Sequence, residues 1–351
     1  QYSTDGDSEH PHFEKIMPFQ TENMRVLAHA ATLWREPQWS DAAQKIRGYL
    51  RTFLTSPEGA FYISQDADVI PGEHAGEYFT LDNAARRARG IPRIDTHLYS
   101  RENGLAITGL AALYAATGDE TILADANRAA AWVLAHRSLD QTGGFTHGGH
   151  AEDGLFLADT LAMGRAFLSL YSVTAERDWL ARAESAAGFI DEKFRAPIGF
   201  VTSASPSVIA APKPQVDENI ALARLTNLLT HHTGKPLYRA MAMHAMRYLA
   251  APVVVESQGY GVGGILLADH ELRGEPVHIT IVGSKGDPAA RALFRAALAM
   301  PGGCKRLEWS DAKEGPLPNA DVQYPELPRA AAFVCKEGVC SAPIFEPEKL
   351  R

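Results

Sequence analysis

The chain has 351 residues, of which 46% are hydrophobic and 22% are charged, so it has the composition of a globular protein and enough length to bury a large core. Its net charge of −8 and the lack of a basic stripe argue against nucleic acid as a partner. No apolar run approaches the roughly 20 residues that cross a bilayer, no signal peptide is visible at the polar start, and three cysteines are too few for a disulfide scaffold. We therefore expect a soluble protein with no membrane partner, and lean towards the cytoplasm.

A repeated pair of helices is the strongest internal pattern in the sequence. Segments rich in Leu, Ala and Met with few charges predict buried helices at about residues 12–33, 103–117, 159–174 and 219–233. An amphipathic partner follows each of them, at about residues 40–54, 120–136, 178–194 and 237–250. Ser40 and Asp178 are candidate N-caps of two partners. Trp39, Trp179 and Tyr238 lie near the start of three partners, where a ring can pack under the preceding helix.

Gly- and aromatic-rich segments separate the helix pairs, at residues 59–62, 143–146 and 198–201, and they predict short strands or β-turns. The repeating unit is thus a buried helix, an exposed helix and a short β segment. Such units stacked in a ring give an inner ring of apolar helices and an outer ring of amphipathic ones. We expect a mainly α fold, an (α/α)6 toroid of helical hairpins. Because four hairpins and a weaker last helix near residues 261–272 are visible, we expect the first helices of the toroid to precede Gln1.

The sequence changes character after the hairpins. A continuous β-branched apolar run at residues 277–283 is typical of a buried strand. A helix is predicted at 288–300, further strands at 305–309 and 330–335, and a loop rich in Pro, Asp and Gly at 310–327. We expect two domains, the toroid over residues 1–274 and a small α/β appendage over residues 275–351.

Polar side chains gather where the inner helices are expected to begin. In a ring of hairpins these N-termini line one mouth, and helix N-termini favour anions and polar oxygens. Paired carboxylates suit general acid–base chemistry or glycosyl transfer, because one can stay protonated while its neighbour is ionised. The candidates for catalysis are His12, Glu14, Asp66, Asp68, Glu102, Asp159, Asp217 and Glu218. The candidates for substrate binding are Tyr2, Asp5, Phe13, Glu77, Arg101, Asn103, Asp153 and Asn219.

Within this set His12 is the candidate base, because neutral His moves a proton near pH 7, and Glu14 or Asp68 is the candidate acid or orienting group. Structural roles explain single members equally well. Asp217 could cap its helix, and Glu102 could complement the helix dipole. A functional pocket is favoured for the set as a whole, because polar groups open all four inner helices.

Three other patterns leave alternatives open. Asp66 and Asp68 could bind a metal ion, but two carboxylates without nearby His ligands are a weak pattern, and we expect no metal or cofactor. His147 and His150 could be metal ligands, although a solvated Gly-rich loop explains them better. The Cys335/Cys340 pair could be a closing disulfide, a redox dithiol or inert thiols, and its spacing is not the C-x-x-C of redox proteins.

Several motifs, taken in order, resemble one protein family. They are Tyr2-Ser3-Thr4-Asp5, Pro11-His12-Phe13-Glu14-Lys15, Asp66-Ala67-Asp68, Asn103-Gly104-Leu105, and Ala332-Phe333-Val334-Cys335 with Cys340 and Pro343. The chain resembles the thioredoxin-domain-containing proteins related to spermatogenesis-associated protein 20. In that family a thioredoxin-like domain precedes an (α/α)6 toroid akin to N-acylglucosamine 2-epimerase. The resemblance implies a carbohydrate-handling scaffold and a thioredoxin-like partner domain that lies outside this chain.

The sequence departs from the family at Glu102, where Trp is usual, and at residues 217–219, where a Ser-Gly-Asn-type sequence is usual. The comparison with the family therefore implies a pocket more acidic than is typical. Our first hypothesis is a sugar isomerase, epimerase or glycoside-processing enzyme that acts on a small-molecule ligand. The alternative is a non-catalytic binding module that works with the thioredoxin-like domain in thiol redox, with Cys335 and Cys340 as the redox pair.

Overall fold

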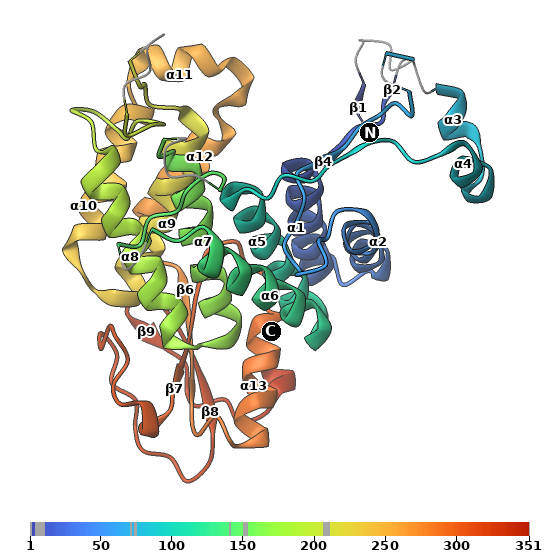
Figure 1. Cartoon of the computed structure of the whole chain (residues 1–351). Helices are drawn as coiled ribbons and strands as arrows, with labels where there is room; N and C mark the ends of the chain where they lie inside the picture. The colour runs from blue at the N-terminus through green and yellow to red at the C-terminus, as the bar shows by residue number, and fades with distance from the viewer. Residues whose placement is uncertain are drawn as a thin grey trace.

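The computed structural model describes residues 2–3, 11–70, 72–73, 76–139, 142–149, 154–205 and 211–350 of the chain. Over these residues the chain is mainly helical. Figure 1 shows helical hairpins standing side by side, a small sheet at their lower end and an arm of short elements at one side. No helix in the described ranges is both long enough and apolar enough to cross a membrane.

Within the described residues, four helical hairpins form the body of the protein. The inner helices are α1 (Met17–Trp34), α5 (Ser100–Thr117), α7 (Leu157–Thr174) and α9 (Val216–Thr233), each of 18 residues. The outer helices are α2 (Pro37–Phe53), α6 (Glu120–His136), α8 (Arg177–Phe194) and α10 (Pro236–Leu249). Each inner helix packs on its own outer partner, and α5 lies between α1 and α7. The predicted inner and outer rings of helices are therefore confirmed.

All four inner helices end in the same way. The next residue has a left-handed backbone, with φ of 56° at Arg35, 73° at Gly118, 55° at Ala175 and 67° at Gly234. Its N–H donates to a carbonyl of the last turn that would otherwise lack a partner. Gly adopts this conformation without steric cost, whereas Arg35 and Ala175 do not. The shared cap shows that the hairpins are copies of one structural unit even where the sequence does not show it.

The first inner helix starts later than the sequence pattern predicts. It begins at Met17 rather than near residue 12, because the two residues before it form strand β3 (Lys15–Ile16), which pairs with β4 (Ser64–Gln65). Pro18 also favours this start, since proline is tolerated in the first turn of a helix but not in its interior.

Two predicted N-caps are wrong. The N-cap positions of α2 and α8 are Glu36 and Glu176, so Ser40 and Asp178 lie inside their helices. The aromatic packing at a helix entry is confirmed for Trp179, whose ring stacks on a Phe ring of α7 with the centroids 5.7 Å apart.

The arm consists of short elements that precede α5 in the chain. It contains β1 (Tyr2–Ser3), β2 (Pro11–His12), β3, β4, α3 (Gly76–Thr80), α4 (Asn83–Arg89) and β5 (Ile94–Asp95). Strand β1 pairs with β2, and β3, β4 and β5 form a second sheet. Figure 1 shows α3 and α4 at the outer end of the arm, away from α5, α7 and α9. These two helices were not predicted, because each is too short to show a helical period.

Two further helices follow the last hairpin. They are α11 (Pro252–Gln258) and α12 (Gly263–Arg273), joined by a 3-10 turn (Gly259–Val262). Helix α12 packs against α9, which confirms the weak helix predicted near residues 261–272.

The C-terminal part is a small α/β layer, as predicted. Strands β6 (Val277–Val282) and β7 (Lys305–Ser310) are parallel and are joined through α13 (Pro288–Leu298), whereas β8 (Ala331–Lys336) and β9 (Val339–Cys340) are antiparallel. Short 3-10 turns occur at Ala312–Glu314 and Pro347–Lys349. The sheet order is β7-β6-β8-β9. One hydrophobic cluster runs from the hairpins into this layer, and the division into two domains at residue 275 stays a prediction.

Candidate functional site

The third residue of three consecutive inner helices is a carboxylate. Glu102, Asp159 and Glu218 hold this position in α5, α7 and α9. The charges of Arg101 and Asp159 act on the Glu218 carboxyl, and those of Asp159 and His147 act on Glu102, so the three helix starts lie within electrostatic reach of one another. We refer to Arg101, Glu102, His147, Asp159 and Glu218 as the carboxylate cluster.

The fourth residue of α5 and of α9 is an asparagine with a structural role. The amide of Asn103 accepts from Phe61 N at 2.8 Å and donates to Phe61 O at 3.1 Å and to Tyr99 O at 2.9 Å. Asn219 repeats this pattern on Phe200, with both bonds at 2.9 Å. Both side chains are fully buried. The two amides tie each β segment to the next inner helix, and a role in substrate binding stays a prediction for which they offer no exposed group.

Asp159 anchors the cluster. It is fully buried, and its Oδ1 accepts from the backbone N–H of Arg101 at 3.0 Å. The Nδ1 atom of His147 lies 3.1 Å from each carboxylate oxygen of Asp159. This hydrogen bond raises the pKa of His147 against the opposing effect of burial, and the charge of Asp159 acts in the same direction. The imidazole stacks on Tyr99 at 3.9 Å between centroids, and one third of its side chain stays exposed.

Glu102 lies beside this pair and is almost completely buried. Its side chain is 8% exposed, and Oε1 accepts from the Arg101 guanidinium at 2.9 Å. Burial raises the pKa of Glu102, while Arg101 opposes that rise. Within the described part of the chain the buried Oε2 has no hydrogen-bond partner. An unpaired buried oxygen carries a desolvation cost that a ligand donor can remove.

Glu218 is the carboxyl whose titration is moved furthest towards neutral pH. Burial raises its pKa to about 7, a hydrogen bond from Thr202 at 2.9 Å opposes the rise, and the charge of Asp217 adds to it. Its Oε2, like that of Glu102, is buried and has no partner among the described residues. The group can therefore gain or lose a proton near pH 7, as general acid–base catalysis requires.

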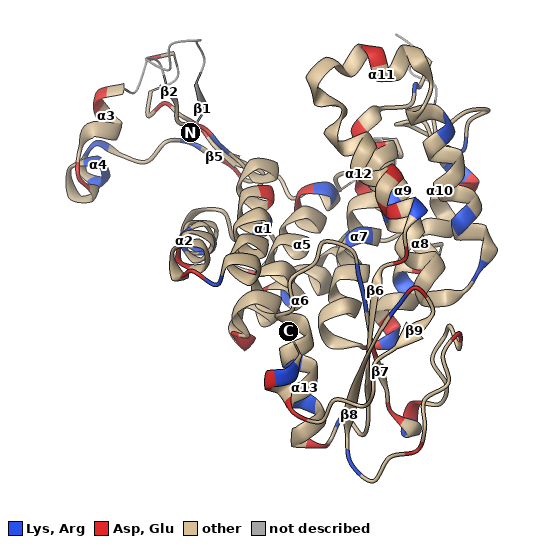
Figure 2. Cartoon of the chain, turned by 180° about the vertical axis from the view of Figure 1, so that it is seen from behind, with Lys and Arg blue, Asp and Glu red and all other residues tan. Residues whose placement is uncertain are grey.

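The structure divides the predicted site residues into two groups. Arg101, Glu102, Asp159, Asp217 and Glu218 come together at the starts of the inner helices, although Asp217 itself is exposed. Figure 2 shows basic and acidic residues next to each other at the start of α5. The residues that lie on the arm instead are His12, Phe13, Glu14, Asp66, Asp68 and Glu77. Asp5 and Asp153, and likewise Glu152 and His150, lie outside the described residues, as does the side chain of Tyr2.

The contacts on the arm are local. His12 Nε2 lies 3.3 Å from Glu14 Oε2, and Phe13 stacks on Phe79 with centroids 4.0 Å apart. The backbone N–H of Asp68 donates to Asp66 Oδ1 at 3.4 Å. Among the described residues, no group of three or more His, Cys, Asp or Glu side chains could hold a metal ion. The role of His12 as a base stays a prediction. The carboxylate cluster is the candidate functional site.

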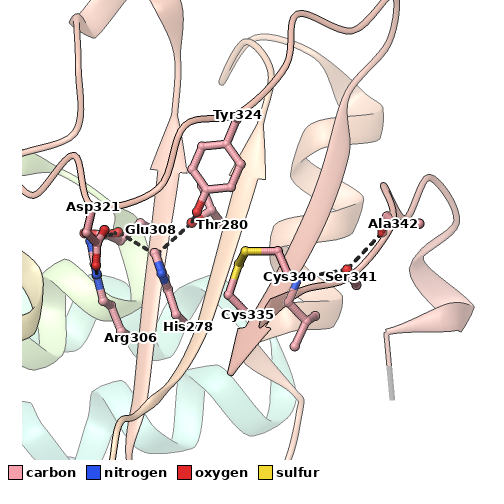
Figure 3. Close-up of a disulfide and its surroundings, with 11 residues drawn as sticks. His278, Thr280, Arg306, Glu308, Asp321, Tyr324, Cys335, Cys340, Ser341 and Ala342 are labelled. Carbon is pink, nitrogen blue, oxygen red and sulfur yellow. Dashed lines mark hydrogen bonds and ion pairs between the residues drawn. A yellow bond between two sulfur atoms is a disulfide. The ribbon is translucent and has the colours of Figure 1, made fainter. Parts of the chain in front are cut away.

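Cys335 and Cys340 form a disulfide between the paired strands β8 and β9 (Figure 3). Cys335 is buried and Cys340 is exposed. On the same sheet, the fully buried Glu308 accepts from His278 at 2.8 Å and from Arg306 at 2.9 Å, and it contacts His232 of α9 at 3.3 Å. The contact with His232 joins the sheet to the inner ring, whereas His278 and Arg306 lie on the sheet itself, so the role of this group is structural. A redox role for the disulfide stays a prediction.

Sequence reasoning missed the most informative histidine of the site. His147 was considered only as a metal ligand or as part of a solvated loop, and Thr202 and Tyr99 were not considered. His147 and Thr202 lie in the loops that precede α7 and α9, and Tyr99 is the N-cap residue of α5. Aligning the inner helices by their starts would have revealed the repeated carboxylate position.

The comparisons with known proteins concern the fold. No model of a known protein family matches the chain, and no curated protein matches its sequence. The D-mannose isomerase structure matches with a TM-score of 0.56 and 14% identity over 70% of this chain and 63% of that one. The cellobiose 2-epimerase of Spirochaeta thermophila DSM 6192 matches with a TM-score of 0.53 and 15% identity over 70% and 61%. A GH76 α-mannanase of Bacteroides thetaiotaomicron matches with a TM-score of 0.52 and 13% identity over 82% and 73%.

These matches define the class of fold. The chain has the α/α toroid fold of sugar epimerases, sugar isomerases and family 76 glycoside hydrolases, which confirms the predicted fold class. The chain spans 63% of the length of the D-mannose isomerase and 61% of that of the cellobiose 2-epimerase. Identities this low show a shared fold and not a shared activity. The resemblance to thioredoxin-domain-containing proteins has no support from these comparisons and stays a prediction.

Proposed function

We propose that this protein is a carbohydrate-processing enzyme of the sugar isomerase or epimerase type, with the carboxylate cluster as its active site. The observation that carries the proposal is the protonation behaviour of Glu218. Burial raises the pKa of Glu218 to about 7, and its carboxyl lies within electrostatic reach of Asp159, whose hydrogen bond raises the pKa of His147. The fold, shared with a D-mannose isomerase and a cellobiose 2-epimerase, supports the same class of substrate.

The reaction needs no cofactor in its simplest form. One group removes the proton from the carbon next to the carbonyl of an open-chain sugar. The electron pair of the broken C–H bond forms a C=C bond, and the π pair of the carbonyl moves onto its oxygen. That oxygen takes a proton from the second group, which gives a neutral enediol. Return of a proton to the former carbonyl carbon, with loss of the proton from the neighbouring hydroxyl to the other group, gives the isomer. Return to the original carbon from the other face, with loss of the proton that the carbonyl oxygen had taken, gives the epimer. Glu218 can gain and lose a proton near pH 7, and His147, whose pKa Asp159 raises, is the candidate second group.

A hydrolytic reaction on the same scaffold is the second candidate, because a family 76 α-mannanase shares the fold. Glycosidases use one protonated and one ionised carboxyl group. Glu218 fits the protonated role, since its pKa is raised. Asp159 fits the ionised role less well, because His147 and the backbone of Arg101 already occupy its oxygens. The structure therefore favours proton transfer over glycosyl transfer.

Deuterium exchange separates these reactions. The protein would be incubated in D2O with D-mannose, cellobiose and an α-mannoside, and the products followed by NMR. Deuterium at the carbon next to the carbonyl is expected for the wild type, with a loss of about 100-fold or more in Glu218→Gln and in His147→Gln. Glu192→Gln, on the exposed surface of α8, should keep the wild-type rate. Mannoside cleavage without deuterium would favour the hydrolase, and no reaction with any of the three sugars would contradict the proposal.

A further inference from the structure

A cavity of about 220 Å³ lies inside the ring of inner helices. Its walls come from α1, α5, α7 and α9, and its floor comes from residues 298–307 of the C-terminal layer. The lining lies about six residues further along the inner helices than the carboxylate cluster, which is about 9 Å at 1.5 Å per residue. The volume is below the roughly 300–1,000 Å³ of pockets that hold drug-sized ligands, so it suits a small group.

The ninth residue of three inner helices is arginine. Arg25, Arg165 and Arg224 hold this position in α1, α7 and α9, and Thr108 holds it in α5. All four line the cavity, together with Lys305 from the floor. Figure 2 shows basic segments on the middle of α7 and α9. A layer of cations inside an otherwise apolar ring is not explained by the packing of the ring.

Most of these cations have partners. Arg25 donates to Glu22 at 2.7 Å, and Arg224 makes a bidentate pair with Glu271 at 2.6 and 2.8 Å. The ammonium group of Lys305 donates to two backbone carbonyls at the end of α13, at 3.0 and 2.6 Å. The carboxylates that line or adjoin the cavity are thus already used.

Arg165 is different. Within the part of the chain that the structure describes, its guanidinium has no hydrogen bond and no ion pair. Burial lowers its pKa, and the charges of Arg25 and Arg224 lower it further against the effect of Glu22. Arginine nevertheless stays protonated in proteins. Arg165 is partly buried and lines the cavity. A partly buried guanidinium without a protein partner can be stabilised by a ligand that supplies a negative charge.

One helical turn further along α7, Ser169 also lines the cavity. Its hydroxyl is not engaged with any described residue and can donate to the same ligand. His29, which also lines the cavity, adds no further positive charge. Burial, together with the charges of Arg25 and Lys305, lowers its pKa to about 4 and keeps it neutral near pH 7. The cavity therefore presents an unpaired guanidinium fork and a hydroxyl, which match the oxygens of a phosphate or carboxylate group.

We infer that the ring interior contains an oxyanion-binding subsite, in which Arg165 binds a phosphate or carboxylate group from the cavity side. This goes beyond the proposed sugar chemistry, since it concerns a second site on the same inner helices. Anion binding can be measured without any enzymatic turnover, so the test of this subsite is independent of the proposed role of the carboxylate cluster.

Thermal unfolding tests the inference with inorganic phosphate and with acetate, each titrated against chloride at constant ionic strength. A saturable rise in Tm with either anion is expected for the wild type, because a ligand that binds only the native state stabilises it. In Arg165→Met the apparent affinity should fall by about tenfold or more. Arg182→Met, on the exposed face of α8, is the matched control and should behave as the wild type. A rise with phosphate alone identifies a phosphate group as the ligand, and a rise with acetate alone identifies a carboxylate.

The same variants exclude a purely structural role for the arginine. In chloride, Arg165→Met should be about as stable as the wild type, because it removes a partly buried charge that has no partner among the described residues. Arg165→Lys keeps the charge but loses the planar fork, and it should bind the anion more weakly than the wild type. No anion-specific rise in the wild-type Tm, an equal rise in Arg165→Met, or a large loss of stability in that variant would each overturn the inference.

Discussion

His147 and Asp159 form the central contact of the carboxylate cluster, with Nδ1 of the imidazole 3.1 Å from each carboxylate oxygen. The aspartate comes from the start of an inner helix and the histidine from the loop that precedes that helix. A carboxylate in this place fixes the ring orientation and holds a proton on Nδ1 when the ring is neutral. Nε2 is then the atom that can accept or return a proton.

Replacing this aspartate tests the pair. In Asp159→Asn the pKa of His147 should fall, because the hydrogen bond and the charge that raise it are weakened. A folded-state pKa above the unfolded value stabilises the protein below the unfolded pKa, and that contribution is lost as pH rises through the folded pKa. The variant should therefore lose stability mainly below pH 6.5, the usual value for His. Histidine NMR titration and urea unfolding at pH 5.5 and 8.5 measure both effects, and an unchanged His147 titration would contradict the pairing.

The contribution of Glu218 to stability should also fall as pH rises, because its pKa is raised as well. Its pKa of about 7 in the folded protein lies above the ordinary value of 4.5, so ionisation destabilises the fold progressively between these two pH values. Glu218→Gln should then be more stable than the wild type by about 1–3 kcal/mol at pH 8 and nearly equal to it at pH 4. Urea unfolding at the two pH values provides the measurement. Equal stability of the two proteins at pH 8 would show that the pKa of the Glu218 carboxyl is not raised.

A neighbouring variant gives an independent check on the same carboxyl. Thr202 donates to Glu218 at 2.9 Å and so lowers its pKa. In Thr202→Val the pKa of Glu218 should rise above 7, and the acidic limb of any pH–rate profile should move to higher pH with it. A profile that stays in place would mean that another group controls that limb.

The buried amides should matter for stability rather than for chemistry. Asn103→Ala leaves the N–H and the carbonyl of Phe61 without their partners, and an unsatisfied buried group costs about 1–3 kcal/mol. Asn219→Ala should cost a similar amount at Phe200, because the bonds are repeated there. Urea unfolding of both variants is the measurement. A large rise in KM with unchanged stability would instead support the substrate-binding role that the sequence suggested.

The sequence predicts the hairpins well because their pattern is local. Helix α6 lies at the predicted residues, and the capping glycines Gly118 and Gly234 end two inner helices where the pattern ends. The grouping of side chains depends instead on how helices stack and how loops fold back. His12 looked equivalent to the residues at other helix starts, but strand β3 separates it from α1. The role of Arg165 could not be predicted from its neighbours in the sequence, because it depends on the arginines at the same position in other inner helices.

The ion pairs around Glu308 should make the junction between the ring and the sheet sensitive to acid. Burial by itself would raise the pKa of Glu308, but hydrogen bonds from His232 and His278 and the charge of Arg306 hold it far below its usual range. A depressed carboxyl pKa gives stability that is present above the unfolded value and lost as pH falls towards the folded value. Glu308→Gln should therefore destabilise the protein at pH 7, by about 1–3 kcal/mol, because Arg306 loses one carboxylate but keeps its ion pair with Asp321.

The difference between this variant and the wild type should shrink as pH falls below 4.5, the ordinary value for Glu. Glu326→Gln, in the exposed loop before β8, is the matched control and should not change the unfolding curve. Urea unfolding between pH 3 and pH 7 shows the trend directly. A constant difference over this range would mean that Glu308 contributes through packing and not through its charge, and the sheet would then be attached to the inner ring mainly by its hydrophobic face.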